Sequence, residues 1–192
     1  QINENQILLL RKMREVNENI VGVLSGGSAI EMPWESCCRA LLHGYLGGEA
    51  GAGAILDLLT GKETPCGKLA ETYPFSYDDT PAALYYPALE RNAEYREGIY
   101  VGYRYYSSAN IAVRYPFGYG LSYTEFSYSD LQISEHAVSF TVKNTGTRSG
   151  GEIVQLYVEL PGAEVFRVKK ELKGYQKLFL KPGEAQRVTF PL

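Results

Sequence analysis

Apolar residues follow a helix-like spacing early in this chain of 192 residues and a strand-like spacing later. Near the start, "NENQILLLRKMREVNEN" places apolar side chains three and four residues apart, which predicts a helix over residues 3–18. The next run, "IVGVL" at Ile20–Leu24, is apolar on both faces and ends at a serine and two glycines. Such a run is typical of a strand in a parallel sheet that helices cover on both sides.

Three further elements are predicted before residue 73. The stretch "WESCCRALLHGYLGG" fits either a helix or a second short strand, and "EAGAGAILDLLTGK" predicts a helix closed by Gly61 ahead of Pro65. "GKLAETYP" predicts a last short strand. This order of helices and strands indicates an α/β layered domain. Two or three strands would leave a parallel sheet with unpaired edges, so we expect residues 1–72 to be the end of a larger α/β domain.

Tyrosine dominates the middle of the chain. Residues 73–130 contain 13 of the 16 tyrosines and show little periodicity. We interpret residues 73–123 as a long ordered connector between two domains, because aromatic rings bury a large area at low entropic cost. The alternative is that some of these rings form a platform on which a sugar stacks.

From Thr124 the pattern changes to a period of two. Five strands are predicted, with turns at Asn144-Thr-Gly, Pro161-Gly and Pro182-Gly between most of them: "FSYSDLQI", "AVSFTVKNTG", "EIVQLYVEL", "KELKGYQKLFL" and "EAQRVTFPL". This spacing indicates that residues 124–192 form a β-sandwich of the fibronectin or immunoglobulin type, which needs about seven strands. The predicted fold class is therefore α/β followed by all-β, and we expect it to be incomplete at both ends.

Composition narrows the functional classes. The net charge of -3 gives no electrostatic footprint for nucleic acid, and no apolar run approaches the ~18 residues that span a bilayer. Cys37, Cys38 and Cys66 cannot all pair with one another and lack the spacing of metal ligands. Three free thiols favour a reducing compartment and hence the cytoplasm, although no targeting signal can be read from residue 1 onward.

Candidate site residues follow from the parallel sheet, because ligands of α/β sheets bind beyond the carboxyl ends of the strands. Ser25 and Ser28 lie after one predicted strand, and Glu49 lies in "GGEAGAG", which fails the nucleotide-binding patterns. For Glu49, the role of an acid that stabilises a helix N-terminus is favoured over a direct catalytic role. Trp34 could stack on a sugar or pack between layers. His43 fits a hydrogen-bonded buried residue better than a base, and no metal site or cofactor is predicted.

Four stretches together resemble glycoside hydrolase family 3, the β-glucosidase family. They are "VGVLSGGSAIEMPW", "ALLHGYLGGEAGAGAILDLLTGKETPCGKLAETYP", "YREGIYVGYRYY" with "YPFGYGLSYTEF", and "VSFTVKNTG…GEIVQLYVELP…KELKGYQKLFLKPGE". They cover nearly the whole chain in family order. The segment "ETPCGKLAETYP" departs slightly from the usual form, since Thr64 and Cys66 stand where the family has asparagine and serine.

The resemblance implies a retaining glycosidase that acts on a β-glucoside or β-linked oligosaccharide and consists of a TIM-like barrel, an α/β sandwich domain and a fibronectin type III-like domain. Residues 1–72 would end the α/β sandwich domain, and residues 124–192 would form a truncated fibronectin-like domain. Such enzymes use two carboxylates. Glu4, Glu15 and Glu18 do not match the family motif of the acid/base, so no catalytic residue is assigned and both carboxylates are expected outside this chain, the nucleophile on the missing barrel.

Two other functions stay open. The β-sandwich could be a carbohydrate-binding or adhesion module without a catalytic role, which aromatic residues exposed on one of its faces would favour. A nucleotide-dependent α/β enzyme is the third reading, weakened by the failed glycine patterns. In the first reading, the chain supports the active site of a larger enzyme and is inactive alone.

Overall fold

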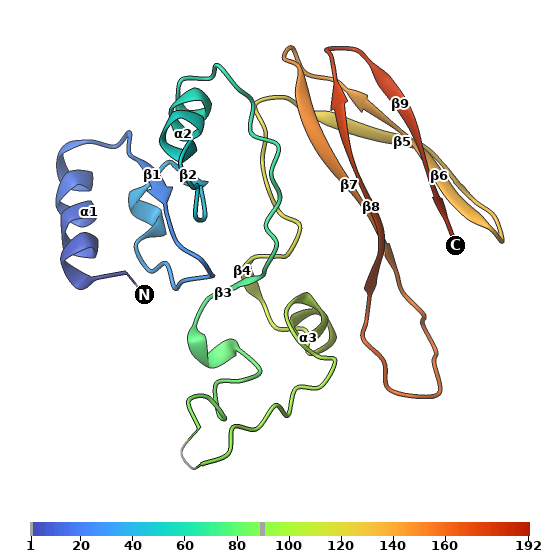
Figure 1. Ribbon diagram of the computed structural model, residues 1–192, viewed down its shortest axis with the longest axis horizontal. Coiled ribbons are helices and arrows are strands. Elements are labelled where there is room, and N and C mark those ends of the chain that lie inside the picture. Colours follow the sequence, from blue (N-terminus) through green and yellow to red (C-terminus); the bar gives the residue numbers. More distant parts are fainter. Residues whose placement is uncertain (1, 89–90) are drawn as a thin grey trace. The chain divides into compact units, whose positions relative to one another are not determined.

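The computed structural model describes residues 2–88 and 91–192, which form two compact units (Figure 1). The first unit comprises the described residues up to Ile55 together with Glu71–Phe117. The second comprises Leu56–Ala70 and Gly118–Leu192. Neither unit is one continuous stretch of sequence. This grouping does not decide the predicted boundaries at residues 72 and 123, which stay a prediction.

The first helix, α1, spans Glu4–Val16 and confirms the predicted helix. Asn3 caps its N-terminus, because the Asn3 side chain accepts a hydrogen bond from the Asn5 N–H at 2.9 Å. Gln6 completes a capping box by accepting from the Asn3 N–H at 3.3 Å. At the other end, the Asn17 N–H donates to the Met13 carbonyl and the chain leaves in an extended conformation.

Strand β1, Val21–Leu24, pairs in parallel with β2, Ala40–His43. The ambiguous stretch before β2 is a short 3₁₀ helix, η1 at Glu35–Cys37, followed by the strand. The predicted burial of β1 on both faces is wrong, since Val21 and Val23 are 53% and 41% exposed. Within the described residues only β2 pairs with β1, so the other edge of β1 is not paired with a strand there.

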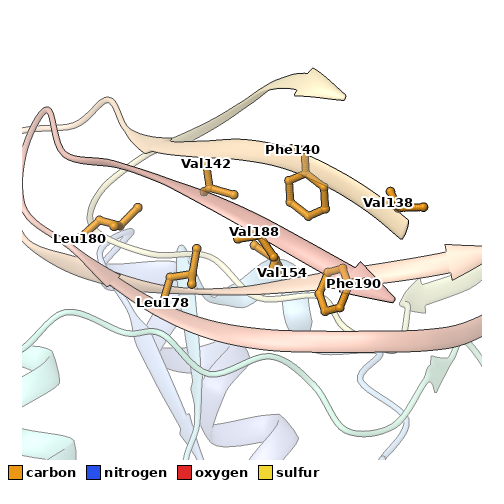
Figure 2. Packing of buried hydrophobic residues seen from close by; sticks show 8 residues of the cluster. All are labelled: Val138, Phe140, Val142, Val154, Leu178, Leu180, Val188 and Phe190. Atoms are coloured by element: carbon orange, nitrogen blue, oxygen red, sulfur yellow. The ribbon is translucent and has the colours of Figure 1, made fainter. Parts of the chain in front are cut away.

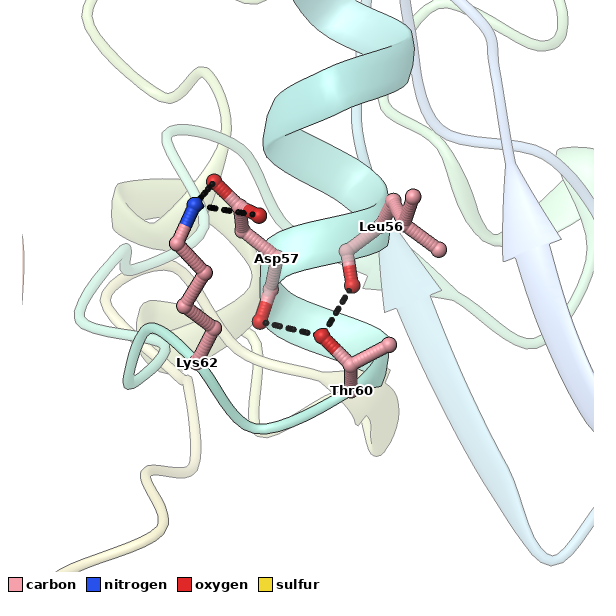
Figure 3. A network of polar contacts seen from close by, with 4 residues as sticks. All are labelled: Leu56, Asp57, Thr60 and Lys62. Carbon is pink, nitrogen blue, oxygen red and sulfur yellow. Dashed lines mark hydrogen bonds and ion pairs between the residues drawn. The ribbon is translucent and has the colours of Figure 1, made fainter.

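The helix α2, Gly51–Leu59, begins in the first unit and ends in the second. Its end has a dense set of polar contacts (Figure 3). The Thr60 hydroxyl donates to the carbonyls of Leu56 and Asp57, and the Lys62 ammonium contacts both carboxylate oxygens of Asp57 at 3.0 and 3.1 Å. Gly61 has a φ of +73°, the left-handed conformation expected of a C-terminal glycine. The predicted helix end is confirmed.

The predicted strand in "GKLAETYP" is mostly absent. Only β3, Tyr73–Pro74, forms, and it pairs antiparallel with β4, Val113–Tyr115, rather than joining β1 and β2. Farther upstream, Leu69 exchanges backbone hydrogen bonds with Gly118 and Tyr119. The two ends of the stretch therefore have different partners: Leu69 pairs with Gly118 and Tyr119, and β3 pairs with β4. The Tyr-rich region also contains η2, Tyr77–Asp79, and α3, Tyr103–Ser108, which the sequence pattern did not predict.

All five predicted strands of the β-sandwich are present in the second unit. They are β5 at Phe126–Ile133, β6 at Ala137–Asn144, β7 at Gly150–Val158, β8 at Glu171–Leu180 and β9 at Ala185–Pro191. Antiparallel pairing gives a three-stranded sheet in the order β5-β6-β9 and a two-stranded sheet of β7 and β8.

The core of the sandwich lies between these two sheets (Figure 2). The sheet of β6 and β9 and the sheet of β7 and β8 both contribute inward side chains: Val138, Phe140, Val142, Val154, Leu178, Leu180, Val188 and Phe190. Val142 and Val154 are fully buried. Burial of a side chain of this kind contributes about 1.5–3 kcal/mol, so this cluster is the main stabilising element of the second unit.

Residues 56–70 belong to the same unit as the sandwich through specific contacts. The Lys68 ammonium forms a salt bridge with Glu152 of β7 at 3.1 Å, and the two side chains are only 16% and 12% exposed. Lys68 also donates to the Gly120 carbonyl at 2.8 Å, while the Tyr123 hydroxyl donates to the Leu58 carbonyl. On the other side of Glu152, the Tyr128 hydroxyl donates to its second oxygen at 2.9 Å. A segment distant in sequence is thereby fastened to the sandwich.

Candidate functional site

The parallel register of β1 and β2 brings the carboxyl ends of both strands level, with Leu24 opposite His43. Two loops begin there: the first edge loop, residues 25–31, and the second edge loop, residues 44–50. The Gly44 N–H donates to the Leu24 carbonyl at 2.9 Å and joins the two loops at their origin. This is the edge at which α/β sheets bind ligands.

The candidate residues from the sequence fall on these loops, with one exception. Ser25 and Ser28 lie on the first edge loop and Glu49 on the second, and all three side chains are exposed. Glu49 stands two residues before α2 begins, so both of its predicted roles stay open. Trp34 is only 2% exposed, which leaves no free ring face for a sugar within this chain. Its burial favours the packing role.

His43, the last residue of β2, is a titratable group at this edge that contacts two tyrosines. Its Nε2 and the Tyr73 hydroxyl form a hydrogen bond of 2.9 Å, which agrees with the prediction of a hydrogen-bonded residue. The His43 ring also contacts the Tyr45 ring, with centroids 3.7 Å apart. Burial lowers the pKa of His43, against the smaller opposing effects of the Leu24 backbone and the Glu71 charge. The imidazole is therefore neutral at neutral pH.

Tyr45 has an unusual backbone conformation, and Tyr73 has an unusually high hydroxyl pKa. Tyr45 has a φ of +49°, in the left-handed region that bulky residues seldom adopt. Such outliers concentrate at binding and catalytic sites. Tyr73 is 2% exposed, and burial, with a further contribution from the Glu71 charge, raises the pKa of its hydroxyl to about 12. The hydroxyl thus keeps its proton across the physiological range.

Two glutamates that the sequence did not single out hold backbone near this edge. Glu71 accepts a hydrogen bond from the Ala29 N–H of the first edge loop at 2.9 Å. Glu31, at the end of that loop, accepts from the Tyr77 N–H at 2.6 Å and from the Ser76 hydroxyl at 3.3 Å. Both carboxylates act as acceptors for amides, which suits positioning of loops. No local sequence signal marks them, because their partners lie more than 40 residues away.

Within residues 2–88 and 91–192, no group of three or more His, Cys, Asp and Glu side chains could hold a metal ion. In the same ranges, no helix has the length and apolar character needed to cross a membrane. Cys37, Cys38 and Cys66 form no disulfide, and burial raises the pKa of the Cys38 thiol.

Comparison with known proteins places both parts of the chain. The sequence profile of the glycosyl hydrolase family 3 C-terminal domain matches residues 1–123, and that of the fibronectin type III-like domain matches residues 152–192. The predicted fold class, an α/β part followed by a fibronectin-like sandwich, is thereby confirmed.

Among curated relatives, thermostable beta-glucosidase B of Acetivibrio thermocellus is 47% identical over the whole chain, which spans 26% of that protein. An exo-alpha-(1->6)-L-arabinopyranosidase of Bifidobacterium longum is 41% identical over 97% of the chain, again spanning 26% of the relative. The chain thus spans about a quarter of the length of these relatives.

Solved structures agree with the sequence comparison. The GH3 beta-glucosidase of Bifidobacterium adolescentis matches the whole chain with a TM-score of 0.95 and 41% identity, over 29% of its own length. The beta-glucosidase of Kluyveromyces marxianus in complex with glucose matches with a TM-score of 0.93 and 39% identity, over 24% of its length. Profile, sequence and fold agree, and the chain belongs to glycosyl hydrolase family 3.

Proposed function

We propose that this chain is a C-terminal segment of a longer retaining glycoside hydrolase that removes terminal β-linked glucosyl residues. The observation that carries this proposal is the match over the whole chain, at 47% identity, to a curated beta-glucosidase. Retaining glycosidases place two carboxylates ~5–5.5 Å apart across the scissile bond. In the proposed enzyme the nucleophile stands on a TIM-like barrel and the acid/base on a further loop, both outside residues 1–192.

Within such an enzyme the chain supports the active site. The edge of β1 and β2 carries two loops whose backbone is held by two hydrogen bonds. The Ala29 N–H donates to the Glu71 carboxylate, and the Gly44 N–H donates to the Leu24 carbonyl. Ser25, Ser28 and Glu49 have exposed polar side chains on these loops and are the residues of this chain proposed to face substrate. Positioning matters to rate, because a displacement of about 1 Å costs up to ~10²-fold.

The identity of the sugar that the enzyme releases is the most detailed part of the proposal. One relative is named a beta-glucosidase and another an exo-alpha-(1->6)-L-arabinopyranosidase, at 47% and 41% identity. β-Glucoside is the proposed substrate, because the two similar solved structures, with TM-scores of 0.95 and 0.93, are also beta-glucosidases. An arabinopyranoside is the natural comparison substrate.

One observation favours the second function, a carbohydrate-binding β-sandwich module. Tyr175 and Phe179 of β8 are 72% and 69% exposed. They lie four residues apart on one strand, so their side chains point to the same side of the sheet, about 14 Å apart along it. Against this function, the sandwich relies on residues 56–70, which lie outside its five strands.

Hydrolysis of aryl glycosides tests the proposal. The full-length protein should release p-nitrophenol from the β-glucopyranoside faster than from the α-L-arabinopyranoside, and proton NMR should show β-glucose as the first product. Residues 1–192 alone should show no turnover. Substantial turnover by these residues alone, or inversion at the anomeric carbon, would contradict the proposal. Loss of glycan binding in Tyr175→Ala and Phe179→Ala, without any hydrolysis by the full-length protein, would support the binding module instead.

A further inference from the structure

The segment Glu71–Tyr73 contacts both edge loops. Glu71 reaches the first edge loop through the 2.9 Å hydrogen bond from the Ala29 N–H. Tyr73 reaches the start of the second edge loop through its 2.9 Å hydrogen bond to His43. Two side chains only two residues apart therefore hold two loops that are separated by a strand and a 3₁₀ helix in sequence.

The residue between them is anchored elsewhere. The Thr72 hydroxyl accepts a hydrogen bond from the Phe117 N–H at 3.2 Å, and Thr72 is 7% exposed. Tyr73 also pairs with Tyr115 in the β3–β4 ladder. The segment is thus also fixed to residues outside the two edge loops, which a clamp requires.

A partly buried ion pair strengthens this anchor. Glu35 of η1 contacts the guanidinium of Arg114 and the hydroxyl of Tyr115, both on β4. The Arg114 and Glu35 side chains are 18% and 26% exposed. Arg114 also lies over the Phe75 ring, 4.9 Å from its centroid. Because β4 is held by charge and by pairing, displacement of β3 relative to the loops is opposed.

Two features of the edge loops indicate that contacts from outside the loops hold their conformation. Tyr45 holds a φ of +49° in the second edge loop, and a bulky residue keeps that conformation only where its surroundings enforce it. The Tyr45 ring rests on His43, which Tyr73 orients. In the first edge loop, four residues of "SGGS" supply little side-chain contact of their own. The Glu71 carboxylate provides a charge-assisted hydrogen bond to this backbone.

We propose that Glu71 and Tyr73 are positioning residues that clamp the two edge loops and thereby set the place of the substrate-facing residues Ser25, Ser28 and Glu49. This proposal rests on the proposed glycosidase function. Neither residue touches the reacting atoms. Glu71 acts through the Ala29 amide, and Tyr73 acts through His43 and Tyr45.

Hydrogen exchange and kinetics on the full-length protein test the clamp together. In Glu71→Ala, peptides covering residues 25–31 should exchange faster while peptides of β6 do not change. In Tyr73→Phe, the increase should fall on residues 44–50. We expect kcat/KM to drop about 10- to 100-fold in Glu71→Ala. Glu71→Gln keeps an oxygen acceptor and should recover most of the loss.

Matched controls separate the clamp from general destabilisation. Tyr157→Phe removes another hydroxyl that donates a hydrogen bond, to the Gln155 side chain of β7 in the second unit. Glu18→Ala removes an exposed carboxylate. Both should leave loop exchange and kcat/KM unchanged. If Glu71→Ala does not fold, Glu71→Gln and Tyr73→Phe decide the matter by the same measurements.

Three results would overturn the clamp: unchanged exchange in both loops, uniformly faster exchange throughout the protein, or a loss of kcat/KM in Glu71→Ala with the loops still protected. The last would assign Glu71 a direct chemical role. If the wild-type protein hydrolyses no glycoside, the proposed function fails by itself, and the exchange data still decide whether Glu71 and Tyr73 hold the loops.

Discussion

At the scale of single residues, His43 shows how burial changes chemistry. Its pKa is lowered, mainly because burial penalises the imidazolium form, and the titratable groups that face it are Tyr45, Tyr73 and Glu71. A group with a lowered pKa in the folded state binds its proton more readily when unfolded. Its contribution to stability is therefore complete above its ordinary pKa of 6.5 and is lost as the pH falls below that value.

This sign predicts the response of a variant that cannot titrate. The unfolding temperature of the protein should fall between pH 7 and pH 5.5, and it should fall less in His43→Gln, which keeps a hydrogen-bonding partner for Tyr73. Thermal unfolding followed by circular dichroism at several pH values measures both slopes. Identical slopes in wild type and His43→Gln would disprove the assignment.

At the scale of elements, the backbone of residues 56–70 lies very close to the backbone that leads into the sandwich. A Cβ atom at Gly120 would overlap the carbonyl oxygen of Gly67, whereas a Cβ at Gly67 would meet nothing within 4 Å. The backbones approach this closely because Leu69, two residues after Gly67, pairs with Gly118 and Tyr119, which directly precede Gly120. Lys68 then reaches Glu152 from the same short segment.

The two glycines thus make a matched pair of variants. Gly120→Ala should destabilise the protein by about 1–3 kcal/mol, since the overlap is with backbone that cannot rotate away. Gly67→Ala should stay within about 0.5 kcal/mol of wild type. Urea unfolding measures both values. Equal stability of the two variants would show that the backbones do not approach as described.

At the scale of the whole molecule, the sandwich is not a self-contained stretch of sequence. The second unit takes residues 56–70 from the middle of the family 3 C-terminal domain match, which covers residues 1–123. Without these residues, the partly buried Glu152 carboxylate would lose its Lys68 partner, and a charge left without its partner in such a position is destabilising. An autonomous binding module would not be built in this way.

A truncated chain tests this dependence. Residues 118–192 alone should unfold at a lower temperature than the sandwich within residues 1–192, with exchange of the Val142 and Val154 amides marking the difference. Glu152→Gln in the truncated chain should restore part of the stability, because it removes the uncompensated charge. If the short chain is as stable as the full one, the sandwich is an independent domain and the carbohydrate-binding module gains support.

The sequence predicted the elements whose pattern is local. The helix α1 and all five sandwich strands follow from periodicity and turn residues, and Gly61 marked the end of α2. Predictions were wrong where a partner decided the outcome. Only Tyr73–Pro74 of "GKLAETYP" became a strand, because Leu69 pairs with Tyr119 instead. The face of β1 that carries Val21 and Val23 is exposed, because other elements of the fold decide whether a strand face is covered.

By itself, the sequence determined the family, the two-part fold class and the edge on which Ser25, Ser28 and Glu49 lie. Short-range periodicity and turn chemistry carry this information, since each depends on neighbours within a few residues. Only the tertiary structure showed that Glu71 binds the Ala29 amide and that Tyr73 binds His43. These partners are 42 and 30 residues apart, and no local pattern records which distant backbone groups a folded chain brings together.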